Sequence, residues 1–472
     1  MIRTRPSAAL ALFVLLIVPV LGGPVPAGAQ DTGSADFSRF VALGDSLGAA
    51  FTSGGLVRGA QEDSVPALVA RQATGATIEQ PLVSEPGIPP LLQLQSIAPL
   101  VIAPLPGLGQ PLNLDLPRPY DNLSVPGFDV GEALRDRDRP GDDLASLILR
   151  VDATMLEQAL ALEPTFALVW LGNNDVLSAA TSGRVVEGVT LTPVDQFTDD
   201  YTALVGALAN AGADLALATV PDVTAIPFVT TIPPVVVDPA TGEPVPGPGG
   251  EPIPLLGPGE RPLGPNDRVL LTASELLAQG IGIPAAVGGT GQGLPDEVVL
   301  SAPEVDAIQA RVAAFNQVIR ETASQVGAAV ADVNALLNRG ATSGFNFGGI
   351  TFTSELVTGG LISLDGVHAT PLGYALAANE FIRAINETYG GDIPSVDLFP
   401  FLFGEDASAI PSIPGAVVSG VQFSREAGRS LLDVLGVTGT AGDGDGSDGP
   451  AGAAPGRPGP EERPVLPAAP IR

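Results

Sequence analysis

The chain alternates short, continuously apolar runs with stretches of amphipathic helical character. The apolar runs occupy residues 40–43, 166–171, 215–220 and 328–333, and helical patterns cover 144–162, 197–211 and 305–326. Continuous apolar strands separated by helices predict a parallel sheet that is covered on both faces. Because ligand sites in such sheets form at the carboxyl ends of the strands, we expect functional residues just after the apolar runs.

The composition restricts the chemistry that is available. The 472 residues include one His and no Cys, and the formal net charge is −30. The lack of Cys excludes disulfides, thiolate metal sites and cysteine nucleophiles, and one His excludes metal sites that need two imidazoles. The negative charge argues against binding to nucleic acid or to anionic lipid. The acidity fits either an ordinary solvated surface or adaptation to high salt.

The first 29 residues have the pattern of an export signal. Arg3 and Arg5 precede an apolar run over residues 8–21, and residues 27–29 read AGA, a small-x-small cleavage motif. We therefore expect cleavage after Ala29 and export to the periplasm or the exterior. An uncleaved membrane anchor is the alternative, but the run is short for a span of about 20 residues.

The rest of the chain divides by composition. One domain is expected over residues 30–390, interrupted by Pro-rich insertions at about 88–123 and 226–264 that show no helix or strand periodicity. The apolar content of the first insertion favours a packed segment over a free linker. An extension of unknown role follows at 391–438, and the Gly-, Asp- and Pro-rich segment 439–472 is typical of a disordered tail.

The one His of the chain lies three residues after a carboxylate. Asp365 and His368 occupy a segment whose Gly366 and Pro371 indicate a loop that leads into a helix over 372–385. On such a loop, Asp365 can hold one ring nitrogen of His368 and leave the other to take a proton. His368 is therefore a candidate general base, although a lone His is more often an incidental surface residue.

Polar segments follow two of the apolar runs. Ser46 ends the segment GDS after residues 40–43, where a hydroxyl can stand exposed above the sheet, or can simply cap a helix. Residues 172–175 read GNND after the run 166–171, and a side-chain amide there can donate to an oxyanion or belong to an Asn-rich turn. Residues 122–127, NLSVPG, end in a glycine whose N–H can approach a ligand.

Taken in order, these four segments resemble the conserved blocks of the SGNH hydrolases, also called GDSL lipases or esterases. Block one is similar to residues 44–47 (GDSL), block two to 122–127, block three to 172–175 and block five to 365–368 (DGVH). The resemblance covers residues 37–388. It implies an α/β fold, a three-layer α/β/α sandwich with a mainly parallel, flavodoxin-like sheet.

The resemblance also implies a role for each matching residue. Ser46 would be the nucleophile, His368 the base, and Asp365 the residue that orients His368. The backbone N–H groups of Ser46 and Gly127 and the side chain of Asn174 would form the oxyanion hole. No metal or organic cofactor is expected.

The activity implied is hydrolysis of carboxylic esters through an acyl-enzyme. Gly131 is the alternative to Gly127, because the first insertion lengthens the spacing between blocks one and two. Apolar insertions beside the site favour a lipid or long-chain acyl ester over another small-molecule ester. A carbohydrate O-deacetylase is the alternative enzyme, and a non-catalytic binding module is the alternative from another class. Neither a nucleic-acid partner nor a stable membrane anchor is expected, and the oligomeric state stays open.

Overall fold

The computed structural model describes residues 30–97, 100–137, 143–150, 152–239 and 241–403. The expected signal peptide, the tail at 439–472 and most of the extension at 391–438 lie outside the described residues. Within the described part of the chain, no helix combines the length and the apolar character that a membrane span requires.

A four-stranded parallel sheet forms the centre of the molecule, as the apolar runs predict. Its order is β1 (Phe40–Gly44), β4 (Phe166–Trp170), β5 (Asp214–Ala218) and β8 (Ala329–Ala331). The side chains of β1 and β4 are buried along their whole length, which explains why these strands are continuously apolar.

The segment of block two extends this sheet beyond β1. The Ala42 N–H donates to Asp121 O at 2.8 Å, and the Leu123 and Val125 N–H groups donate to Ala42 O and Gly44 O. The spatial order is therefore 121–125, β1, β4, β5, β8, which is the flavodoxin-like order that the resemblance implies. The chain winds in opposite directions from β1 and from β4, so a crevice opens between their carboxyl ends.

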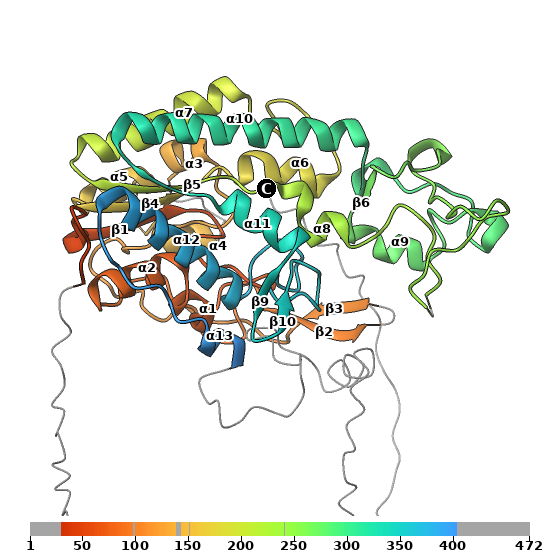
Figure 1. Cartoon of the computed structure of the whole chain (residues 1–472), viewed down its shortest axis with the longest axis horizontal. Helices are drawn as coiled ribbons and strands as arrows, with labels where there is room; N and C mark the ends of the chain where they lie inside the picture. The colour runs from red at the N-terminus through yellow and green to blue at the C-terminus, as the bar shows by residue number, and fades with distance from the viewer. Residues whose placement is uncertain (1–29, 98–99, 138–142, 151, 240, 404–472) are drawn as a thin grey trace, which may run out of the picture.

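Helices cover both faces of the sheet (Figure 1). One apolar core joins alternate strand residues such as Val41 and Leu43 to the first helical layer, and the other joins Phe40 and Ala42 to the second. The first layer contains α3 (Val130–Arg135), α4 (Asp143–Ile148), α5 (Met155–Ala161), α6 (Asn174–Ser182), α7 (Val194–Asn210) and α10 (Ala302–Val326). The second contains α1 (Arg58–Glu62), α2 (Val65–Thr74), α11 (Val333–Thr342), α12 (Pro371–Tyr389) and α13 (Phe399–Phe403).

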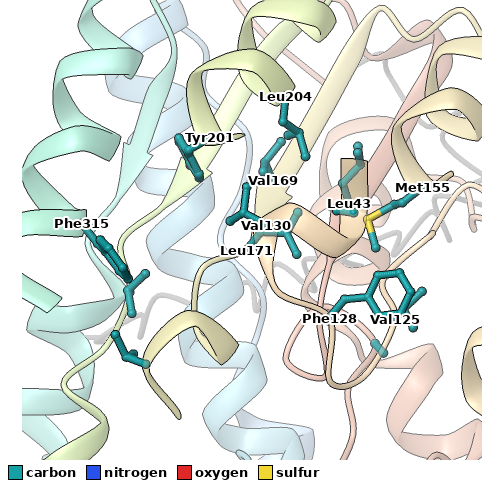
Figure 2. Packing of buried hydrophobic residues seen from close by; sticks show 14 of the residues in the cluster. Leu43, Val125, Phe128, Val130, Met155, Val169, Leu171, Tyr201, Leu204 and Phe315 are labelled. Atoms are coloured by element: carbon teal, nitrogen blue, oxygen red, sulfur yellow. The ribbon is translucent and has the colours of Figure 1, made fainter. Parts of the chain in front are cut away.

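The first core anchors the segments that lead to the candidate site. Figure 2 shows Val125 and Phe128, from the segment of block two, among the same cluster as Leu43 and Leu171 at the ends of β1 and β4. All four side chains are at most 1% exposed. The backbone at the carboxyl edge of the sheet is therefore held by close packing directly beneath the polar residues.

The helical pattern over 144–162 corresponds to two helices, so the prediction of one continuous helix is wrong. The Thr154 side chain accepts the Glu157 N–H while Glu157 accepts the Thr154 N–H, a capping box that starts α5 anew. Such reciprocal capping satisfies the first N–H groups of a helix, which have no partner within it. The apolar periodicity did not show this break.

The first insertion is not free of regular structure, contrary to the expectation for residues 88–123. It contains the antiparallel hairpin of β2 (Leu92–Ile97) and β3 (Leu100–Pro104). Buried Leu94 packs against Val357 and Leu364, which lies next to Asp365. The hairpin therefore supports the loop of block five from outside, while Leu108 and Leu114 remain at least half exposed.

The second insertion forms a small lobe that extends beyond its expected end at residue 264 (Figure 1). Its own apolar cluster joins residues between Val236 and Val299. The lobe contains α8 (Pro227–Thr230), α9 (Ser274–Ala278) and the antiparallel pair of β6 (Arg268–Val269) and β7 (Val299–Leu300). Because much of it is held by isolated bridges such as Val235 with Pro254, it has no periodicity that a sequence pattern could show.

The described start of the C-terminal extension packs along α12. The Asn386 amide donates to Ile393 O and accepts the Ile393 N–H, both at 2.9 Å. Two helical turns earlier, Asn379 makes the same pair of hydrogen bonds with Val396. Two Asn side chains on one face of α12 thus each bond both the N–H and the C=O of one residue of the extended segment, as a neighbouring β-strand would.

Candidate active site

Ser46 lies in a tight turn directly after β1. The Ala49 N–H donates to Asp45 O at 3.0 Å, and the Phe51 N–H donates to Ser46 O at 2.9 Å. Ser46 is 6% exposed, and neither its hydroxyl nor its backbone N–H makes a hydrogen bond to another described residue. Gly48 permits the turn, because a Cβ at this position would collide with the Ser124 side chain.

The fully buried Asp45 joins the ends of β1 and β4. Its carboxylate accepts the Leu47 N–H at 2.9 Å and the Asn173 amide at 2.6 Å. Burial raises the pKa of Asp45 to about 6, although these two hydrogen bonds oppose the shift. Asp45 and Asn173 therefore fix the positions of the residues that follow them, Ser46 and Asn174.

The loop of block five holds His368 in a defined orientation. Its Nδ1 lies 2.9 Å from Asp365 Oδ2, and Asp365 Oδ1 accepts the backbone N–H groups of Val367 and His368 at 2.8 Å. Burial alone would raise the pKa of Asp365, but the charge and hydrogen bonds of His368 outweigh it and lower the pKa. Asp365 is therefore ionised, and the Nε2 atom of His368 is left for another partner.

Hydrogen bonds join this loop to the turn after Ser46. The Gly54 N–H donates to Asp365 Oδ2 at 2.9 Å, and the Tyr374 hydroxyl donates to Phe51 O at 2.6 Å. The Phe51 and His368 rings are 4.8 Å apart between centroids. The fold thus brings the blocks of Ser46 and His368 together, but no hydrogen bond joins these two side chains in the described part of the chain. Such catalytic contacts are often long until substrate binds.

The residues expected to form the oxyanion hole lie at the ends of neighbouring segments. Asn174 begins α6, and its amide donates to Phe128 O at 2.9 Å, which leaves a second amide hydrogen available. Gly127 lies in the adjoining turn with φ of +89°, and its N–H has no partner among the described residues. Gly131, the alternative, lies within α3.

A buried carboxyl that sequence reasoning did not assign lies behind Asn174. Asp175 accepts the Val130 N–H at 3.1 Å and is 2% exposed. Burial, together with the charge of Asp129, raises the pKa of Asp175 to about 8. The available signal was its position in the GNND segment. This segment directly follows a buried strand, where neighbouring segments can enclose a carboxyl side chain.

Asp175→Asn is expected to reduce the pH dependence of stability. The folded chain holds the Asp175 proton more tightly than the unfolded chain, so this stabilisation is complete below pH 3.8 and is lost as the pH rises toward about 8. The loss amounts to at most about 1.4 kcal/mol per pH unit. Urea unfolding at pH 7, 7.5 and 8, above the pKa of Asp45, should show a smaller decline for the variant. Equal declines would contradict the raised pKa.

An apolar cavity of about 90 Å³ lies beside these residues. Its lining includes Leu47, which follows Ser46, and Val367 and Ala369, which flank His368. Other walls come from the end of β4, the segment after β5, α11, α12, Phe345 and the segment 354–362. None of the lining residues belongs to the first insertion, so residues 88–123 do not form the cavity that adjoins Ser46.

Comparisons with known proteins agree with this arrangement. The model of a family described as GDSL-like lipase/acylhydrolase matches residues 40–381. No curated protein matches the chain.

Several solved structures match the chain at low identity. A lipase/acylhydrolase from Enterococcus faecalis is 14% identical, with a TM-score of 0.30, over 76% of this chain and 100% of the other. A variant of an acetyl-xylooligosaccharide esterase from Geobacillus is 13% identical, with a TM-score of 0.32, over 74% and 94%. The hydrolase LAE5, from the metagenome of Lake Arreo, is 13% identical, with a TM-score of 0.33, over 75% and 96%.

Proposed function

Because the chain belongs to the GDSL-like lipase/acylhydrolase family, whose members hydrolyse esters, we propose that it is a serine esterase with Ser46 as its nucleophile. The observation that carries this proposal is the position of His368. Its ring is oriented by an ionised Asp365 and packed on Phe51, which follows the Ser46 turn. An acid that orients an imidazole next to a serine turn supports this proposal, because acid, imidazole and hydroxyl acting in that order activate a serine.

In the proposed reaction, the Ser46 hydroxyl attacks the carbonyl carbon of the ester and His368 Nε2 takes the hydroxyl proton. The N–H groups of Ser46 and Gly127 and the Asn174 amide donate to the oxygen on which negative charge develops. Collapse of this intermediate breaks the bond to the alcohol, which leaves with the proton from His368. Water, deprotonated by His368, then attacks the acyl-enzyme and releases the acid and the free serine.

The acyl group is proposed to enter the apolar cavity beside Leu47. In the acyl-enzyme this group stays bonded to Ser46 Oγ, so an apolar wall next to Ser46 stabilises an aliphatic chain through both steps. A cavity of about 150 Å³ holds benzene with its six carbons. By that ratio, a volume of about 90 Å³ accommodates about three or four carbon atoms.

The test is hydrolysis of p-nitrophenyl esters from acetyl to dodecanoyl, below their micelle concentrations. We expect kcat/KM to rise by up to about fourfold per methylene until the cavity is full, near four carbons. A maximum at acetyl would contradict an aliphatic acyl site and favour the carbohydrate O-deacetylase. If no ester is hydrolysed and a fluorophosphonate does not label Ser46, the result would favour the non-catalytic binding module.

We also propose that the enzyme is exported, as the pattern of residues 1–29 indicates. The N-terminal sequence of protein recovered from the medium or periplasm tests this. A start at Gln30 would agree with cleavage after Ala29, whereas a retained, membrane-bound N-terminus would contradict it.

A further inference from the structure

A second cavity of about 270 Å³ lies behind the acyl cavity, between α11, α12 and the hairpin of β9 (Phe345–Phe347) and β10 (Ile350–Phe352). We call the cavity beside Leu47 the inner cavity and this one the outer cavity. The exposed Arg339 and Asn346 line only the outer cavity, so it opens at the protein surface.

The two cavities share three lining residues, Leu336 of α11, Phe345 of β9 and Leu376 of α12. Side chains that line both cavities must stand between them. Phe345 has the largest of the three side chains and is 6% exposed. Its ring lies under the Arg339 guanidinium, 4.3 Å from the ring centroid to Cζ. We propose that this three-residue partition, with Phe345 at its centre, sets the length of acyl chain that the enzyme accepts.

This inference rests on the proposed esterase function and adds to it a residue that determines specificity. With the partition in place, an acyl chain that fills the inner cavity meets the Phe345 ring. Without the ring, the chain continues into the outer cavity, whose volume is three times larger. The apolar side chains of Phe347 and Leu376 and the stem of Arg339 then contact the added methylenes.

The first variant that tests the partition is Phe345→Ala. We expect its octanoyl-to-butyryl ratio of kcat/KM to rise at least about tenfold over the wild type, because each added methylene gains up to about fourfold. Phe347→Ala is the matched control, since Phe347 belongs to the same hairpin but lines only the outer cavity. Its ratio should stay at the wild-type value. Equal ratios in the two variants would overturn the proposal.

A second variant changes the inner cavity in the opposite direction. Gly340 lies within α11 and lines the inner cavity, and a Cβ there would stand 3.2 Å from Leu361 Cδ1 and 3.9 Å from Phe345 Cε2. Ala is the better helix former, so Gly340→Ala should fold even if Phe345→Ala does not. We expect it to lower the butyryl rate several-fold while acetyl turnover is kept. Equal losses for acetyl and butyryl would contradict a role in chain length.

A third series distinguishes the acyl chain from the alcohol. Alkyl acetates from ethyl to octyl carry the variable chain on the leaving group, and their relative rates should not respond to Phe345→Ala. A response there, without one in the acyl series, would overturn the assignment of the cavities to the acyl group. If the wild type hydrolyses no ester, the proposed function itself fails. Normal hydrolysis with an unchanged length profile defeats only the partition.

Discussion

Replacement of Ser46 or of His368 by alanine is expected to lower kcat by roughly 10⁴–10⁶-fold. Ser46→Ala removes the atom that bonds to the acyl carbon, and His368→Ala removes the group that takes its proton. The chain contains one His, so no second imidazole can replace it. Because the two side chains act in the same step, the double variant should lose less than tenfold more than either single variant.

The measurement is single-turnover and steady-state hydrolysis of the best ester, with circular dichroism to verify folding. KM should change little, because neither side chain makes the apolar contacts that hold the acyl group. Turnover near the wild-type rate in His368→Ala would rule out the proposed mechanism. Independent losses that multiply in the double variant would show that the two residues do not share one step.

Asn174→Ala is expected to lower kcat by roughly 10²–10³-fold, with a smaller change in KM. One hydrogen of the Asn174 amide is already bonded to Phe128 O, so the amide is held in place before the reaction begins. The other hydrogen can strengthen its bond as the carbonyl oxygen becomes charged, which favours the transition state over the bound ester.

Asn173→Ala is the comparison, and the structure shows that its effect is of another kind. Asn173 donates at 2.6 Å to the buried Asp45, so its removal leaves a carboxylate oxygen without that partner. We expect a loss of about 1–3 kcal/mol in unfolding free energy and a much smaller loss of kcat than in Asn174→Ala. If kcat falls more in Asn173→Ala, the assignment within residues 172–175 is shifted by one residue.

The central sheet could be predicted because its strands are buried on both faces almost along their whole length and are therefore mainly apolar. The end of β1 at Gly44 and the end of β4 at Trp170 follow the same pattern. The polar residues that follow these strands lie in short, contiguous motifs. The candidate site could therefore be located without knowledge of distant contacts. The hydrogen-bond partner of Asp45 could not be predicted, because Asn173 lies 128 residues away in the sequence.

The insertions could not be predicted for a different reason. The β2–β3 hairpin has an irregular register between Leu94 and Ser96, which interrupts the alternation that marks a strand. The lobe of the second insertion is built from short bridges in which Pro residues take part. The inner cavity is lined by side chains from several distant segments, and no local sequence pattern shows that these side chains meet.

The hydrogen bonds between the Ser46 turn and the block-five loop have a consequence for synthesis. They join residues 310 to 323 positions apart, so the loop after β1 lacks these particular partners until the start of α12 exists. Ribosomes add roughly 5–20 residues per second, which leaves the nascent N-terminal part waiting for tens of seconds. Until α12 has docked, the chain has neither its base beside the nucleophile nor a closed inner cavity. Hydrolytic competence therefore arises at the end of folding, and an incomplete chain is released inactive.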